Sequence, residues 1–371
     1  MAEGASTSQF RADLQRRLAR FSHDAIRSRT TSGDPVFAVG STTGPNRPDN
    51  QDRAATAIIR FPHDRNPRLQ LAIICDGMGG MAGGATAASE AIGAFIAVVA
   101  LTEGSLEIVL DRAIRAANAA VHHRFKGEGG TTLTAVVSND REAWYAHVGD
   151  SRLYDHGPEG LCLLTQDDTI SGAIQAHGGG HDEDALDNRL LQFVGVGDAI
   201  APHIQRVDQR EGHMWLLTSD GAHGLGRKVL ETLLEGGRSA DDVVRRMVYV
   251  ADALNVRDNA SIAAVKQLDT FDRDTATSGT TIKITVPGGS LEIWLSERPA
   301  VNEERERRHQ DSPALLEGDL PAPQIEAPSA SVESTRKTKR KGKGSRAREK
   351  GVNPRPLEVL FERKQADDSH S

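Results

Sequence analysis

The sequence predicts a mixed protein of the α+β class, in which helices and short antiparallel strands occupy separate stretches of the chain. Residues 85–125 hold two helical patterns, an Ala-rich apolar run over 85–99 and a one-sided apolar face over 106–125. Residues 132–164 then hold four short strand-like runs separated by turns, which favour an antiparallel meander. The 371 residues suffice for one large domain or two small ones.

The composition is that of a globular protein, with 38% hydrophobic and 26% charged residues. The longest apolar stretch, 91–101, is shorter than the ~20 residues that cross a bilayer, and no basic-then-apolar leader opens the chain. We therefore expect a cytoplasmic protein without membrane contact. Cys75 and Cys162 both lie in apolar strand-like runs, so we expect two reduced, buried thiols without a catalytic role.

Residues 1–28 predict an amphipathic helix at the start of the chain. Phe10, Leu14, Leu18 and Phe21 recur at helical spacing among several arginines, which fits a helix that docks on the rest of the protein. A helix that binds a partner protein is the alternative.

The main domain is expected to span residues 29–270. Its last helix is predicted over 241–254, and the preceding Ser239-Ala240-Asp241-Asp242 indicates a capping box. The polar, Gly-rich stretch 165–197 is long for a loop, so it is either a functional flap or disordered. The remaining strands of this domain are expected at 36–40, 54–61, 69–75, 214–218 and 260–266.

Two further segments follow the main domain. Residues 271–302 predict an appended β-hairpin, with strands at 281–286 and 291–295 around Pro287-Gly288-Gly289. Residues 303–371 are charged and rich in Pro and Ala, and we expect them to be disordered.

The tail contains a basic segment, 336–350, with nine Lys or Arg residues against one Glu. Because the whole chain has a net charge of -7, an acidic body carries a basic tail. Such a segment could bind nucleic acid or an acidic partner through its positive charge. No aromatic residue stands within the segment to stack on bases, so a solubilising extension is the favoured interpretation.

Five aspartates stand where predicted apolar strands begin or end: Asp52, Asp76, Asp150, Asp220 and Asp258. Taken singly, each is more simply a turn residue or a helix cap. Together they predict a shared cation site, because like charges brought together repel unless a cation lies among them. Five glycines in the eight residues from Gly77 allow close backbone approach, and the Asp76 oxygens with the Gly77 carbonyl suit Mg²⁺ or Mn²⁺.

Seven short motifs between residues 36 and 266 resemble, in their order, the protein phosphatase 2C family of metal-dependent serine/threonine phosphatases. The motifs are Arg47-Pro48-Asp49-Asn50-Gln51-Asp52, Asp76-Gly77-Met78-Gly79-Gly80, Gly130-Thr131-Thr132, Gly149-Asp150-Ser151-Arg152, Leu164-Thr165-Gln166-Asp167, Ser219-Asp220-Gly221 and Asp258-Asn259. The resemblance implies an αββα four-layer sandwich, two antiparallel sheets flanked by helix pairs. It also implies two Mn²⁺ or Mg²⁺ ions, with a weaker third ion in bacterial members.

The resemblance assigns the cation ligands by motif. Asp76 would bridge both ions, the Gly77 carbonyl would bind the first, and Asp220 and Asp258 would bind the second. Asp52 would act nearby, largely through cation-bound water.

Two further roles follow from the resemblance. Asp150, with Asp220, matches the position of the third ion, and Arg47 would hold the substrate phosphate, which suits a planar and permanently charged group. In the implied reaction, water activated by the cations attacks phosphorus in line without a phosphoenzyme. Ser151 and Ser219 are therefore expected to be structural hydroxyls beside the acids.

The chain departs from the family pattern at four places. Gln51 stands where Glu is usual, Met81 and Ala85 replace a common His and Glu, and Asp168 stands where His is often found. All direct ligand positions are kept, which favours an active enzyme. It would act on a phosphorylated protein opposite a cognate serine/threonine kinase, and we expect a monomer. The alternatives are a weak or inactive phospho-binding scaffold and a small-molecule phosphoester hydrolase.

Overall fold

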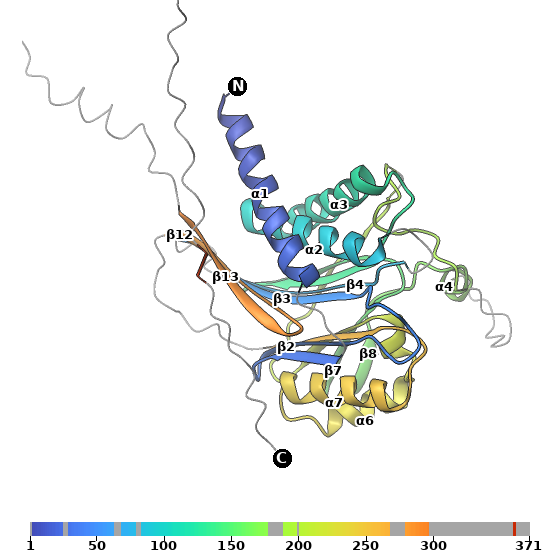
Figure 1. Ribbon diagram of the computed structural model, residues 1–371. Helices are drawn as coiled ribbons and strands as arrows, with labels where there is room; N and C mark the ends of the chain where they lie inside the picture. The colour runs from blue at the N-terminus through green and yellow to red at the C-terminus, as the bar shows by residue number, and fades with distance from the viewer. Residues whose placement is uncertain are drawn as a thin grey trace, which may run out of the picture. The chain divides into compact units, whose positions relative to one another are not determined.

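The structure is a computed structural model. It describes residues 2–24, 29–62, 68–78, 83–176, 188–198, 200–267, 279–296 and 359–360. Within them, two antiparallel sheets lie against each other and helices cover their outer faces (Figure 1). The predicted α+β class and the αββα four-layer sandwich are therefore confirmed. The expectations for Gly79 to Met81, for much of the 165–197 stretch and for nearly all of the 303–371 tail lie outside the described residues.

One sheet has six strands. They are β1 (Arg29–Gly33), β2 (Phe37–Thr42), β7 (Arg152–Gly157), β8 (Gly160–Leu163), β10 (Met214–Thr218) and β11 (Ala260–Lys266). Their order across the sheet is β1-β2-β11-β10-β7-β8, and all neighbouring pairs are antiparallel. The sequence patterns missed β1, because its residues Arg-Thr-Thr-Ser-Gly include no aliphatic side chain larger than a methyl group and are nowhere fully buried.

The other sheet has eight strands. They are β3 (Arg53–Arg60), β4 (Arg68–Cys75), β5 (Leu133–Ser138), β6 (Ala143–Val148), β9 (His203–Val207), β12 (Gly279–Val286), β13 (Gly289–Ser296) and β14 (Val359–Leu360). Their order is β14-β13-β12-β3-β4-β5-β6-β9. The hairpin predicted after the main domain is β12 and β13, and it extends this sheet because β12 pairs with β3.

Three helices cover the outer face of the eight-stranded sheet: α1 (Ala2–Asp24), α2 (Gly84–Leu101) and α3 (Leu106–Phe125). Leu14 and Leu18 of α1 are fully buried in the same core as α2. A side chain at Gly93 of α2 would collide with α1, since a Cβ there would lie 2.6 Å from the Gln15 carbonyl oxygen. α1 therefore docks on the body, the first of the two alternatives given by its spacing.

α2 is long and apolar enough to cross a membrane by length and composition alone. The fold buries 78% of it between α1, α3 and the sheet, so its apolar character is explained by its place in the core.

The outer face of the six-stranded sheet packs against α5 (Asp220–His223), α6 (Arg227–Glu235) and α7 (Ala240–Ala253). The capping box predicted before α7 is wrong in detail. Among the described residues the Ser239 side chain makes no capping bond to a backbone amide, because its hydroxyl donates to the Asp241 carboxylate at 2.5 Å.

The third core lies between the two sheets and includes Val39 of β2, Ile74 of β4 and Trp215 of β10. Strands β3 and β4 are therefore buried on both faces, which explains why their sequences are continuous apolar runs instead of alternating ones.

The prediction of two buried thiols is half wrong. Cys75 at the end of β4 is fully buried, whereas Cys162 is exposed. The reason is topological, because β8 is an edge strand that turns Cys162 and Leu163 outward and buries only Leu161 deeply.

Candidate metal centre

The five predicted aspartates are brought together around Asp76. They stand at the ends of β3, β4, β6, β10 and β11, so both sheets contribute to the cluster. Burial first, and then the charges of the other four aspartates, raise the pKa of Asp76 well above its usual range. The site therefore concentrates negative charge that a cation would neutralise.

The backbone of Asp76 is held by two threonines of the predicted Gly-Thr-Thr motif. The Thr131 hydroxyl and the Thr132 amide both donate to the Asp76 carbonyl oxygen, at 2.8 and 2.9 Å. The Thr132 hydroxyl accepts from the Asp76 amide at 2.9 Å. At Gly77, a Cβ would lie 2.4 Å from the Gly84 carbonyl oxygen and 2.7 Å from that of Gln51, so only glycine fits.

Asp52 is the most deeply buried member, with 1% of its surface exposed. Its Oδ2 accepts a 2.7 Å hydrogen bond from the Ser219 hydroxyl, which in turn accepts the Ser261 amide at 2.9 Å. Its buried Oδ1 has no hydrogen-bond partner within the described part of the chain. Burial first, and the charge of Asp220, raise the pKa of Asp52 to about 7.

Asp150 and Asp220 share this environment. Burial, then the charges of Asp220 and Asp167, raise the pKa of Asp150 to about 7. Burial and the charge of Asp258 raise the pKa of Asp220. The buried Oδ1 of Asp220 also lacks a hydrogen-bond partner among the residues that the structure describes. Ser151, next to Asp150, bonds Thr132 at 2.7 Å, so both predicted structural serines support the cluster.

Arg47 lies at the rim and pairs with Asp258. The two side chains are 41% and 32% exposed, in contrast to the buried aspartates. The hydrogen bond that Arg47 donates to Asp258 is the first cause that raises the pKa of Arg47, and the charges of Asp258, Asp220 and Asp76 add to it. The loop that carries Arg47 is tied down by Asn259, whose amide nitrogen donates to the Thr43 carbonyl at 2.8 Å.

The donor set fits hard divalent cations. Its oxygens are carboxylates, and two of them are buried without a partner from the described residues, an arrangement that a cation would satisfy. Within the described ranges, no three His, Cys, Asp or Glu side chains form a ready-made coordination shell. Mg²⁺ usually binds one or two carboxylates and keeps several waters, so hydrated ions shared among these aspartates remain compatible with the geometry.

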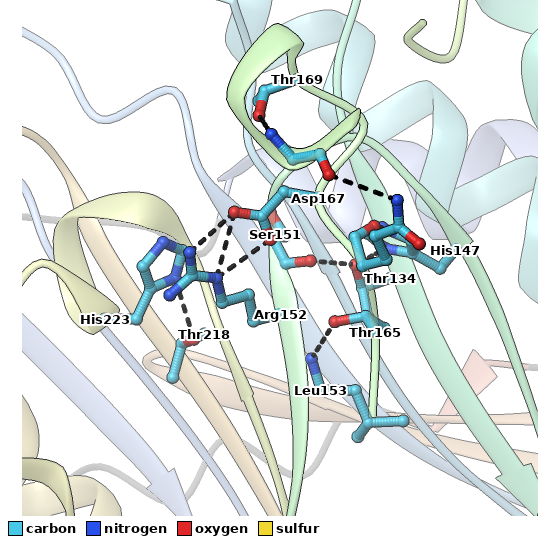
Figure 2. Close-up of polar contacts among 12 residues, drawn as sticks. Thr134, His147, Ser151, Arg152, Leu153, Thr165, Asp167, Thr169, Thr218 and His223 are labelled. Carbon is cyan, nitrogen blue, oxygen red and sulfur yellow. Dashed lines mark hydrogen bonds and ion pairs between the residues drawn. The ribbon is translucent and has the colours of Figure 1, made fainter. Parts of the chain in front are cut away.

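Motif matching named Arg152 and Asp167 without giving them a role. Figure 2 shows them as an ion pair, in which Arg152 Nε and a terminal nitrogen donate to Asp167 Oδ1 and Oδ2 at 2.9 and 2.7 Å. The charge of Asp167 also acts on Asp150. His223 lies next to the ion pair, and burial followed by the charge of Arg152 lowers its pKa to about 3. The pair fixes the loop after β8 against β7.

His147 makes a second cross-link in the same view (Figure 2). Its two ring nitrogens bond the Thr134 hydroxyl at 2.8 Å and the Gln166 carbonyl at 2.9 Å, and Thr134 also donates to the Ser151 carbonyl. Burial lowers the pKa of His147. No sequence spacing marks these links, because they join residues 13 to 19 positions apart.

The two-sheet sandwich, with carboxylates from both sheets at its strand ends, is similar to the fold of solved PPM-type serine/threonine phosphatases. The solved catalytic domain of PstP, a serine/threonine phosphatase in complex with two manganese ions, shares the fold with a TM-score of 0.54 and 25% identity. That match covers 65% of this chain and all of that domain. No model of a known protein family matches the chain.

Two sequence relatives agree with the structural match. The phosphatase PstP of Mycobacterium tuberculosis is 33% identical over 162 residues, which are 41% of this chain and 31% of PstP. A putative protein phosphatase 2C-type of Streptococcus pyogenes is 26% identical over 236 residues, 60% of this chain and 93% of that protein. The chain thus spans about a third of the length of PstP. Its sequence and fold are thus similar to those of bacterial phosphatases of the protein phosphatase 2C type.

Proposed function

We propose that the chain is a metal-dependent phosphatase that hydrolyses phosphoserine and phosphothreonine in proteins. The observation that carries the proposal is the gathering of four acidic charges around Asp76, with buried, unpartnered oxygens on Asp52 and Asp220 within the described residues. Bound Mn²⁺ or Mg²⁺ would supply a water of lowered pKa and would neutralise the phosphoryl oxygens.

The residues of the chain divide the work by position. Asp76, the Gly77 carbonyl, Asp220 and Asp258 would hold the two main cations, and Asp150 with Asp220 would hold a weaker third. Asp52 accepts the Ser219 hydroxyl at one oxygen, and its other oxygen, which lacks a partner among the described residues, would accept from a cation-bound water.

Arg47 binds the phosphate from the rim of the site. Its guanidinium pairs with Asp258. Because Asp258 is a proposed cation ligand, a phosphate bound by Arg47 would lie beside the cations that neutralise its charge. The substrate in this proposal is a phosphorylated protein, produced by a serine/threonine kinase in the same cytoplasm, and the enzyme acts as a monomer.

Turnover of a phosphothreonine peptide and of p-nitrophenyl phosphate by the full chain tests the proposal, with Mn²⁺, with Mg²⁺ and with chelator. We expect hydrolysis only with a divalent cation and a preference for the peptide. A preference for the small ester would move the substrate class to small phosphoesters. Absence of turnover in every metal, while calorimetry still detects Mn²⁺ binding, would contradict the enzyme and indicate a phospho-binding regulator.

Substitution of Arg47 separates its role from that of the cations. Arg47→Ala is expected to lower kcat/KM for the peptide by about 10–100-fold, mainly through KM, because it removes a charged phosphate ligand. Arg47→Lys should recover only part of the loss, since an ammonium lacks the planar two-pronged geometry. Arg245→Ala, at an exposed ion pair on α7, is the control and should leave both constants unchanged.

If Arg47→Ala instead lowers kcat at constant KM, the phosphate is not held in the ground state by Arg47.

A further inference from the structure

The carboxylate of Asp168 lies at a junction of three segments. Its Oδ2 accepts the Gly149 amide at 2.8 Å and the Gln192 side-chain nitrogen at 2.8 Å. Its Oδ1 bonds His203 Nε2 at 2.8 Å. Only 11% of the Asp168 side chain is exposed, so these bonds are made largely away from water. One side chain therefore joins the loop after β6, the 188–198 segment and strand β9.

The backbone of Asp168 strengthens the same junction. Its amide donates to the Gly149 carbonyl at 2.7 Å, and its carbonyl accepts the Leu191 amide at 2.7 Å. Asp168 and Gly149 are thus bonded to each other twice, once through the side chain and once through the main chain. Because Asp168 holds Gly149 by these bonds, it also fixes the position of the next residue, Asp150.

Gly149 connects this junction to the candidate metal centre. It directly precedes Asp150, and its φ of 111° is one that glycine adopts without strain. A Cβ at Gly149 would lie 2.7 Å from the Thr132 side chain, so the two residues are in close contact. Thr132 in turn holds the Asp76 amide. A shift of Gly149 would therefore move Asp150 directly and would also displace Thr132, which holds the Asp76 amide.

The 188–198 segment is tied to the same two points. Gln192 bonds Asp168 and also pairs with Ala201 in both directions, at 3.0 Å each. Two residues further on, Val194 exchanges backbone hydrogen bonds with Thr131, at 2.8 and 3.1 Å. The segment is thus anchored both to the Asp150 loop and to the threonine that holds the Asp76 carbonyl.

A carboxylate is the side chain that this junction requires. It must accept hydrogen bonds from three directions, and the two oxygens of Asp168 provide them. A neutral histidine in this place would offer only one ring nitrogen as an acceptor and could not make the same three contacts. In this chain Gln192 and His203 supply the hydrogen-bond partners that an aspartate at position 168 requires.

We propose that Asp168 is a positioning residue that fixes the Gly149–Asp150 loop at the metal centre and couples it to the 188–198 segment. Asp168 touches neither cation nor substrate and acts through Gly149 and Gln192. The inference rests on the proposed function only for the statement that Asp150 binds a cation. The mechanical part concerns the metal-free chain and is testable there.

The first test compares Asp168→Ala and Asp168→Asn in the metal-free, full-length protein by amide hydrogen exchange. The alanine variant should speed exchange of the Gly149 amide and of residues 188–198 by at least about 10-fold, because all three side-chain bonds are lost. The asparagine variant should stay close to wild type. Its oxygen can accept from Gly149 and Gln192 while its nitrogen donates to a neutral His203 ring.

The second test is titration with Mn²⁺, followed by calorimetry. Loss of a residue that orients a ligand typically lowers metal affinity by about 10–100-fold. Asp168→Ala should therefore lower the affinity for the more weakly bound Mn²⁺ ion by that factor. Asp168→Asn should retain affinity within about 3-fold. Asp208→Ala is the matched control, because Asp208 is 80% exposed beside the end of β9 and pairs only locally with Arg210 among the described residues.

The outcomes separate this inference from the proposed function. Unchanged Gly149 exchange in Asp168→Ala overturns the positioning role, whatever the enzyme does. Faster exchange with unchanged Mn²⁺ affinity overturns the link to Asp150. If wild type shows no turnover while Asp168→Ala shows both effects, the proposed function fails and the inference stands. Should Asp168→Ala not fold, Gln192→Ala decides: it must speed exchange of residues 188–198 and, to a smaller extent, of the Gly149 amide, or the coupling is wrong.

Discussion

Asp76→Asn is expected to abolish turnover and, in the same molecule, to stabilise the metal-free fold. The variant removes the charge on which four other acidic groups act, and an amide can donate to the neighbouring carboxylates where a carboxylate repels them. We expect kcat to fall by at least about 10³-fold. The free energy of unfolding in chelator at pH 8 should rise, because burial and the neighbouring charges penalise the ionised Asp76 carboxylate.

Urea unfolding in chelator and with saturating Mn²⁺ measures the change in stability, and turnover of the phosphothreonine peptide measures the loss of activity. Wild type should gain stability from Mn²⁺, and Asp76→Asn should gain little, because its strongest shared ligand is gone. Asp208→Asn, at an exposed carboxylate, is the control for the charge change itself. If Asp76→Asn is less stable than wild type in chelator, the carboxylates do not repel one another and the cation site is not the reason for their gathering.

The stability of the metal-free protein is expected to fall as the pH rises from 6.5 to 8. Asp52 and Asp150 have folded pKa values of about 7, above the ordinary value of 3.8, so the fold binds protons that the unfolded chain has released. Such groups stabilise the fold at low pH and lose that contribution as the pH passes through 7. Each contributes about 1 kcal/mol over this interval, and Asp76 adds to it in the same direction.

The buried histidines oppose this trend. The pKa of His147 and of His223 is lowered, so the fold keeps them neutral, and stability is gained as the unfolded chain releases its histidine protons around pH 6.5. The raised pKa of His203 acts in the direction of the carboxylates. Unfolding at pH 6.5 and 8 in chelator measures the net slope, and the change of that slope in Asp150→Asn isolates the contribution of one carboxylate. An unchanged slope in Asp150→Asn would mean that Asp150 is ionised at little cost.

Saturating Mn²⁺ should reverse the sign of this dependence. Cations and protons compete for the same carboxylates, so the gain in stability from Mn²⁺ is larger at pH 8 than at pH 6.5.

The positions of the acidic residues were predictable because each follows or precedes a strand with a strong apolar pattern. β4 reads as Leu-Gln-Leu-Ala-Ile-Ile-Cys and ends one residue before Asp76, and β10 ends two residues before Asp220. Strands that are buried on both faces appear in the sequence as continuous apolar segments. The αββα architecture was predicted from the order of the motifs, because no single apolar segment specifies it.

Other elements left no comparable pattern. β9 is a polar edge strand whose residues are nowhere fully buried, and α6 buries only Leu230 and Leu234 over nine residues. The supports of the site were also hidden, because a hydrogen bond between Asp168 and Gly149 depends on how two loops meet. Sequence reasoning marked Asp168 only as a departure from the family pattern. Its partners Gln192 and His203 are 24 and 35 positions away, so its role required coordinates.

The hairpin formed by β12 and β13 has a consequence for the stiffness of the metal centre. Without it, β3 would be a sheet edge, with one row of its backbone groups facing solvent. With β12 paired from Thr56 to Arg60 and β4 paired from Arg53 to Arg60, β3 becomes an interior strand held on both sides. Asp52 directly precedes β3, whose first three residues, Arg53 to Ala55, pair with β4. The hairpin holds the strand from Thr56 onward, so residues after the motif-bearing region limit how far fraying could spread toward Asp52.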